Sequence, residues 1–296
     1  MANTLYTPAQ AARSTLAALR WLSLLPRTVR QDFSAEFVAG RGQTVNVRKP
    51  ITAGKAKVYT KANRDARAAI QFNDLDEQFV PVKLEDQVYN AVRLPDDFAT
   101  FSLENLQRQV LIPQAESVVD ELSSPLIDEM TAIATDASIP AILPDGSNVR
   151  SALIQARKVL NARKVPAANR FVAVGADLEA AFLEDELLQK ANESGTTETL
   201  REATIGRLFG FTIVADPNLP ADFGSAYHQD AFAFVTRPSR QPEGAAKSAT
   251  VSQDGFSLRW IQHYNPLQLE DQSVVDTFYG AATLDATRAV SLTKAP

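Results

Sequence analysis

The feature that most constrains this sequence is a segregation of charge that begins in residues 41–72. That segment carries eight basic residues against the single acid Asp65, a net charge of +7, whereas the whole 296-residue chain has a net charge of −5. It has few large apolar side chains, so it cannot bury enough surface to form a core of its own. Apolar residues alternate on both sides of Gly54, which predicts a two-stranded excursion with this glycine near its tip.

A second segment, residues 101–136, has the opposite character, with seven acidic residues against Arg108 alone. The basic segment has three possible roles. It could bind nucleic acid, its lysines could keep an extended edge soluble, or it could dock on an acidic surface of another copy of the chain. Residues 41–67 contain one tyrosine and no interleaved aromatic residues for base stacking, which weakens the first role.

The residue counts exclude several classes of protein. The chain is long enough for one large or two ordinary domains, and its 45% apolar residues can bury a sizeable core. The absence of cysteine excludes disulfides, thiolate metal sites and cysteine catalysis. We expect no membrane span, because no run of eighteen apolar residues occurs. We also expect no signal peptide, because Arg20 interrupts the apolar patch at 16–25, which favours an amphipathic arm or short helix.

The pattern of the remaining elements predicts an α+β fold. Apolar steps of three and four over residues 113–130 predict a long helix with acids on its outer face, which Pro125 should kink or divide. Residues 170–188 predict a buried strand, a tight glycine turn and a helix. Residues 201–220 predict a short helix, a glycine exit and a strand closed by a turn of Asn and Pro. Further strands are expected at 79–94, where helix competes in the second half, and at 231–238, 256–265 and from 271 onward.

Few residues are candidates for chemistry. His228 and Asp230 could form a general base with its orienting carboxylate. However, the sequence has no G-x-S-x-G motif to supply an activated serine, and a structural histidine is the favoured interpretation. The acidic pairs at 184–186 and 96–97 lack the spacing of a calcium loop. We therefore expect no catalytic residue, no cofactor and no metal.

The order of these elements resembles that of the major capsid proteins of tailed double-stranded DNA bacteriophages, which have the Hong Kong 97-like fold. The stretch GRGQTVNVRKP looks like the beginning of the extended loop of that family, and the acidic helix looks like its spine helix. RFVAVGADLEAAFLEDELL resembles a strand and helix of the axial domain. GRLFGFTIVADPNLP resembles a recurrent coat-protein stretch, and AFAFVTRP and VVDTFYGAATLDATRAVSL look like the late strands.

The resemblance implies a division of the chain into four parts. These are an N-terminal arm, an extended β-hairpin loop, a peripheral domain with the long spine helix, and an axial domain with a central sheet. Their expected bounds are, respectively, 1–43; 44–75; 76–138 with 252–285; and 139–251 with 286–296.

The resemblance also implies a function, that of a non-enzymatic subunit. Such a subunit assembles in the host cytoplasm into the hexamers and pentamers of an icosahedral virion capsid around double-stranded DNA. Portal, scaffolding and decoration proteins are implied as partners, with weak non-specific DNA contact and no membrane contact. An encapsulin shell, which has the same fold, is the alternative, and a soluble hydrolase is a more distant one.

In this family the extended loop lies over a neighbouring subunit, which gives the charge segregation a meaning. We expect the basic loop of one copy to dock against the acidic spine region of the next copy. The residues expected at this contact are Arg48, Lys49, Lys55, Lys57, Lys61 and Arg64 in the loop, and Glu116, Asp120, Glu121, Asp128 and Glu129 in the acidic region.

Overall fold

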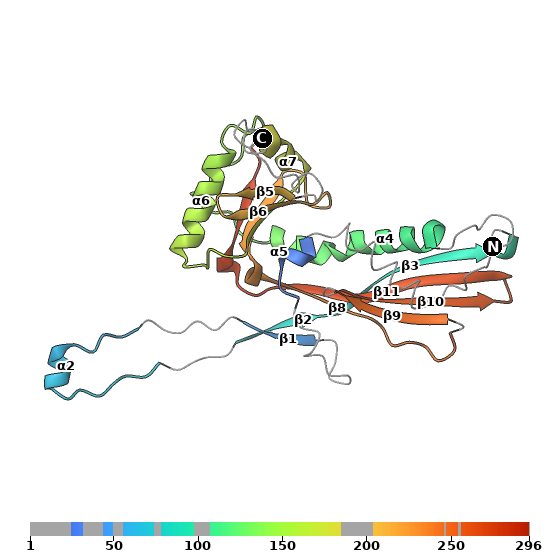
Figure 1. The fold of residues 1–296 in the computed structure, drawn as a ribbon, viewed down its shortest axis with the longest axis horizontal. Helices are drawn as coiled ribbons and strands as arrows, with labels where there is room; N and C mark the ends of the chain where they lie inside the picture. Colours follow the sequence, from blue (N-terminus) through green and yellow to red (C-terminus); the bar gives the residue numbers. More distant parts are fainter. Residues whose placement is uncertain are drawn as a thin grey trace.

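A computed structural model shows an elongated chain with two five-stranded sheets and one projecting arm, whose root is a two-stranded sheet (Figure 1). It describes residues 25–31, 44–49, 56–73, 78–97, 107–184, 204–245, 247–253 and 256–295. The expected contact residue Lys55, the expected tip residue Gly54 and most of the expected N-terminal arm lie outside these ranges.

The longer lobe is built on an antiparallel sheet. Its strand order is β3 (Asp86–Pro95), β11 (Glu270–Thr283), β10 (Phe256–Asn265) and β9 (Lys247–Gln253). The second half of β11 pairs with β8 (Phe232–Arg237), because β11 is 14 residues long and runs beyond β10. Helix α4 (Ile112–Leu122) lies along β3 and β11, as Figure 1 shows.

The acidic helix divides where the sequence predicted. A single π-helical turn (Gln107–Leu111) leads into α4, and α5 (Ser124–Thr131) follows after Ser123. Pro125 lies in the first turn of α5, where its missing amide costs little but prevents one continuous helix. Leu122, Leu126 and Met130 are fully buried against the sheet, whereas Asp120, Glu121 and Asp128 are exposed on the opposite face.

The second lobe contains a mixed sheet. Its strand order is β12 (Ala289–Thr293), β7 (Phe223–His228), β4 (Arg170–Val174), β6 (Phe211–Ala215) and β5 (Thr204–Leu208). Only β4 and β6 are parallel. Helices α6 (Val149–Ala162) and α7 (Ala176–Glu184) contribute Leu153, Leu160 and Phe182 to the core of this lobe.

The predicted strand, glycine turn and helix at 170–184 are confirmed. Gly175 separates β4 from α7, and a Cβ atom there would lie 2.0 Å from the carbonyl oxygen of Pro220. Such a contact is sterically impossible without moving the backbone, so this turn requires glycine.

The short helix predicted before β6 is wrong where the structure describes it. Residues 204–208 form strand β5, which pairs antiparallel with β6. Phe209 and Gly210 connect them with φ values of +48° and +85°. Two successive residues with positive φ make the tight hairpin turn whose twist matches that of the flanking strands. The glycine therefore makes a hairpin turn and not a helix exit.

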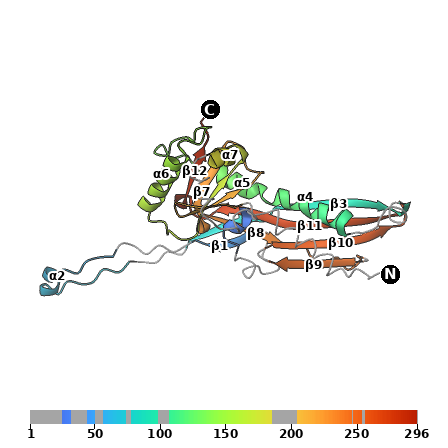
Figure 2. The same cartoon turned by 45° about the horizontal axis from the view of Figure 1, so that its top comes forward.

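The arm differs from its prediction in two ways. Its root is a two-stranded ladder of β1 (Thr44–Arg48) and β2 (Phe79–Lys83), so the returning strand lies beyond the expected loop boundary at residue 75. The most distant described element is a short helix, α2 (Lys61–Asp65), and residues 66–73 of the returning limb are not a strand (Figures 1 and 2). The predicted strand at 79–94 is likewise two strands, β2 and β3.

The root of the arm is packed firmly on the longer lobe. Val45, Val47 and Val82 are buried with Val235 and Leu284, so the two arm strands share a small core with β8 and the end of β11. A Cβ atom on Gly280 of β11 would lie 2.3 Å from the Lys83 carbonyl oxygen, which shows how closely β2 crosses β11.

Strand pairing does not follow the expected boundary between the two domains. Residues 139–251 were expected in the axial domain together with 286–296. In the structure β12 does join the second sheet, but β8 and β9 pair with β11 and β10 of the longer lobe. Near residue 231 the chain therefore passes from one sheet to the other.

Candidate functional site

Most basic residues of the arm are exposed; Lys49, at the packed root, is half-buried. Arg48 ends β1, with its guanidinium carbon 5.9 Å from the centre of the Phe79 ring, and Lys49 follows it. Lys57, Lys61 and Arg64 lie on or beside α2, and all three are exposed. Lys57 Nζ makes one long contact, 3.4 Å, with Gln71 Oε1 on the returning limb.

The end of the arm is a defined local structure in spite of its exposure. The Thr60 hydroxyl accepts a hydrogen bond from the Asn63 amide at 3.3 Å and caps α2. The Tyr59 hydroxyl contacts the carbonyl oxygens of Asn63 at 3.1 Å and Ala68 at 2.7 Å. Arg67 has a φ of +46°, the left-handed conformation with which many helices end.

The acidic residues lie on the outer face of α4 and α5. Asp120, Glu121 and Asp128 are exposed, and Glu116 is half-buried. Glu129 is engaged within the chain, because its Oε2 accepts hydrogen bonds from the Thr283 amide at 3.0 Å and the Thr283 hydroxyl at 2.5 Å. This contact joins α5 to the end of β11, so Glu129 is less available to a neighbour than the other four acids.

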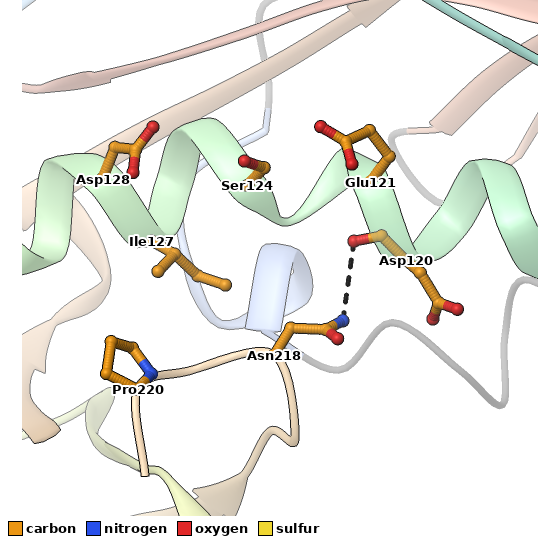
Figure 3. Close-up of a pocket in the computed structure, with 7 residues that line it drawn as sticks. All are labelled: Asp120, Glu121, Ser124, Ile127, Asp128, Asn218 and Pro220. Carbon is orange, nitrogen blue, oxygen red and sulfur yellow. Dashed lines mark hydrogen bonds between the residues drawn. The ribbon is translucent and has the colours of Figure 1, made fainter. Parts of the chain in front are cut away.

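A pocket of about 380 Å³ lies between this acidic face and the turn after β6 (Figure 3). The side-chain amide of Asn218 donates a 3.5 Å hydrogen bond to the Asp120 carbonyl oxygen. The residues that line the pocket are Asp120, Glu121, Ser124, Ile127, Asp128, Asn218 and Pro220.

Asp216, in the same turn after β6, is almost fully buried. Burial raises the pKa of its carboxyl group, the Asp120 charge acts in the same direction, and the hydrogen bond from the Asn218 amide opposes both. The pocket itself is lined by the carboxylates of Asp120, Glu121 and Asp128, so its acidic lining suits a cationic side chain.

The structure does not bring the basic and acidic sets together within one chain. In both views the arm projects away from the two lobes, and α2 lies far from α4 and α5 (Figures 1 and 2). Any contact between the α2 cations and the acids of α4 and α5 therefore requires a second copy.

His228 and Asp230 do not have the arrangement of a general base with an orienting carboxylate. Nδ1 of His228 accepts a hydrogen bond from the Asp230 amide at 3.1 Å, so it does not donate to the carboxylate, which lies 3.7 Å away. The carboxylate also lies 3.4 Å from Nη1 of Arg288. Burial lowers the pKa of His228, which fits a neutral structural imidazole.

The described ranges lack two further kinds of feature. No cluster of three or more His, Cys, Asp or Glu side chains suited to a metal ion occurs there. No helix in that part of the chain has the length and apolar character needed to cross a membrane.

Solved structures from phages and a virus-like particle have a similar fold. A structure of Mycobacterium phage Che8 superposes with a TM-score of 0.61 at 21% identity, covering 90% of this chain and 89% of that one. The capsid of the cyanophage P-SCSP1u gives 0.58 at 11% identity, covering 100% and 91%. A virus-like particle from Pyrococcus furiosus gives 0.55 at 12% identity, covering 96% and 98%. No protein-family model and no curated protein sequence matches the chain.

These comparisons establish the fold. The chain has the mixed helix and sheet fold of phage capsid structures over nearly its full length, and the capsid fold expected from the sequence is confirmed.

Sequence reasoning located the arm and the acidic helix, but it missed the pocket that the turn after β6 completes. The signal available for it was the Asp-Pro-Asn-Leu-Pro turn at 216–220, which nothing in the sequence connects to the helix.

Proposed function

We propose that this chain is a major capsid protein, a structural subunit that assembles with copies of itself into an icosahedral shell. One observation supports the proposal: the arm is packed on the longer lobe at its root, but within the described residues its end is not packed against either lobe. Residues 56–73 are all exposed except Asn63, which is half-buried. A segment that gains so little burial within one chain needs another surface to hold it.

The acidic face of α4 and α5 on a neighbouring copy is that surface in our proposal. Lys57, Lys61 and Arg64 would face Asp120, Glu121 and Asp128, with Arg48, Lys49, Lys55, Glu116 and Glu129 at the edges of the contact. An exposed ion pair contributes only about 0–1 kcal/mol. Several pairs together guide the approach and register of two copies, and a shell repeats the contact many times.

We further propose hexamers and pentamers as the intermediate units, with double-stranded DNA inside and only weak, non-specific contact with it. Portal, scaffolding and decoration proteins would be partners during assembly in the host cytoplasm. The subunit would have no enzymatic activity. The net charge of −5 supports this interior role, because a strongly basic wall would hold the packaged DNA tightly.

Two alternatives remain. An encapsulin-type shell shares the expected fold and differs in its contents, a protein cargo in place of DNA, so the contents of purified particles distinguish the two. A soluble hydrolase using His228 and Asp230 is opposed by the hydrogen bond that His228 Nδ1 accepts. Replacement of His228 by Ala should leave particle formation intact.

Negative-stain microscopy of the purified protein tests the proposal directly. We expect uniform closed particles or rings of subunits, and a uniformly monomeric sample at high protein concentration would contradict the proposal.

The arm contact is tested by a Lys57→Glu and Lys61→Glu double variant over a salt series. Because it reverses the charge that approaches the acidic face, we expect assembly to fail in this variant and to weaken with salt in the parent chain. Lys158→Glu with Lys164→Glu, on exposed positions of the second lobe, is the matched control.

A further inference from the structure

Two connections between the lobes meet at one point. From β7 of the second lobe the chain enters the longer lobe through the 3₁₀ helix η4 (Gln229–Ala231). From β11 of the longer lobe it returns through the 3₁₀ helix η5 (Ala286–Arg288). The amides of Leu284 and Asp285, between β11 and η5, both donate to the Ala231 carbonyl oxygen, at 2.8 and 3.1 Å. The two connections therefore form one junction, and a movement of η4 is passed directly to the chain that enters β12.

His228 holds η4 in place. It is the last residue of β7 and is 6% exposed. Its Nδ1 accepts a hydrogen bond from the Asp230 amide at 3.1 Å, which is the role of a capping side chain at the start of a helix. A hydrogen bond to the Ala168 backbone, in the loop before β4, holds the same ring. The imidazole therefore ties η4 to the second lobe only while Nδ1 carries no proton.

Three charged side chains surround this imidazole, each from a different element. The Asp230 carboxylate of η4 lies 3.7 Å from Nδ1. That carboxylate is already paired with Arg288 of η5 at 3.4 Å, and Arg288 also lies 3.1 Å from Asp285. Arg170 of β4 is the residue opposite His228 in the pairing of β4 with β7. The two guanidinium groups oppose a positive charge on the ring, and a proton there would compete with Arg288 for Asp230.

Protonation of His228 would reverse the hydrogen-bond role of Nδ1, because both nitrogens of an imidazolium are donors. The new N–H would face the amide N–H of Asp230, and two donors cannot pair. The nearest acceptor for the new proton is the Asp230 carboxylate, but that pairing would draw the carboxylate away from Arg288. Either response removes a contact that joins η4 to β7 or to η5.

We propose that His228 is an acid-sensitive switch at the junction between the two lobes, closed while its ring is neutral and open when the ring is protonated. Opening would free η4 and η5 while leaving the core of each lobe folded. The switch would thus change the freedom of one lobe relative to the other. The inference concerns the single subunit, so it stands or falls independently of shell assembly.

The direction of the pH dependence follows from the surroundings of the ring. Burial lowers the pKa of His228, Arg288 and Arg170 act in the same direction, and Asp230 opposes them. The open junction therefore binds a proton more readily than the closed one. The closed form has its full stability above the ordinary histidine pKa of about 6.5 and loses it as pH falls toward the lower pKa of the closed form. Within that window each pH unit shifts the balance by up to about tenfold.

Hydrogen exchange of the unassembled protein at pH 7 and pH 5, corrected for the intrinsic effect of pH on exchange, tests the switch. His228→Asn keeps an oxygen that can cap η4 but cannot take up a proton. His263→Asn is the matched control, because His263 is exposed on β10 and is the only other histidine in the sequence. In the parent chain and the control, we expect the Asp230 and Leu284 amides to lose protection about tenfold relative to amides of β4 and β6. In His228→Asn this ratio should not change with pH.

A titration of the parent chain gives a second measurement that does not depend on the variant. The nuclear magnetic resonance signal of the His228 ring and the exchange of the junction amides should change with the same midpoint, below pH 6.5. Three results would overturn the switch. These are junction amides that stay protected at pH 5, junction amides that lose protection together with β4 and β6, and a His228→Asn variant that responds to pH as the parent does.

Discussion

The second lobe and the arm obtain their order from different sources. In the lobe, a mixed sheet and two helices enclose a core in which Phe182, Phe211 and Leu153 have no exposed surface. In the arm beyond β1 and β2, no described side chain is buried, and α2 is held by a cap, a left-handed end and one tyrosine hydroxyl. The lobe is therefore complete by itself, whereas the end of the arm becomes well packed only when another surface covers it.

The same substitution in the two regions gives the largest contrast. Phe182→Ala removes a fully buried ring and should lower the free energy of unfolding by about 3–5 kcal/mol. Phe72→Ala removes an 88% exposed ring and should leave the free energy of unfolding of the unassembled chain within about 0.5 kcal/mol of the parent. Urea denaturation of unassembled protein measures both. Equal losses would mean that the end of the arm packs on its own chain.

A buried ion pair offers the next largest effect, in the longer lobe to which the arm is attached. Both carboxylate oxygens of Asp276 on β11 are 2.8 Å from guanidinium nitrogens of Arg259 on β10. Asp276→Asn would leave Arg259 without its carboxylate partner and should lower the free energy of unfolding by about 3 kcal/mol. This is the low end for a broken buried pair, because the amide oxygen can still accept a hydrogen bond. Glu243→Gln, which breaks an exposed pair with Arg240, is the control and should not move the unfolding midpoint.

Tyr59→Phe examines the local order of the arm itself. Loss of the hydroxyl removes its contacts with the Asn63 and Ala68 carbonyl oxygens, and a net hydrogen bond contributes about 1 kcal/mol. Hydrogen exchange at the Ala66 and Ala68 amides should become faster, while exchange in β4 and β6 stays unchanged. Slowed exchange on assembly in the parent chain would show that a neighbour covers this end of the arm.

The smallest effect is expected at Asp216, and it depends on pH. Burial raises the pKa of its carboxyl group above that of the unfolded chain, so the folded state favours the protonated form. The stabilising contribution of that proton is present at low pH and is lost as pH rises through the folded pKa. Asp216→Asn should therefore stabilise the protein near neutral pH, with a difference that vanishes in acid. Thermal melts at several pH values measure it, and a destabilised variant at pH 7 would contradict this account.

The sequence predicted those parts of the fold that local patterns encode. The division of the acidic helix followed from Pro125, and the turn between β4 and α7 followed from Gly175. The segregated charge of residues 41–72 correctly indicated a segment without its own core, because composition alone limits what a segment can bury.

The remaining features depend on pairing between distant residues. Strand β5 was expected as helix because its short polar stretch has no strand alternation, and only pairing with β6 through Phe209 and Gly210 makes it a strand. Residues 232–237 and 247–251 were expected in the axial domain, but they belong to β8 and β9, whose partners β11 and β10 follow later in the chain.

The candidate site shows the same limit. The exposed acids were identifiable by type, but the turn at 216–220 completes their pocket through a contact about a hundred residues apart in sequence.

The clamped root of the arm has a mechanical consequence. Valines of β1 and β2 are locked against β8 and β11, and Gly280 permits a backbone crossing that no other residue would allow. The arm is therefore fixed in direction at its root, which is packed on the subunit core, and projects from that root toward α2. If copies join through its free end, the angle between neighbours is determined at Val47, Val82 and Gly280. Changes at these buried positions would then alter the curvature, and so the diameter, of the assembly that the subunits form.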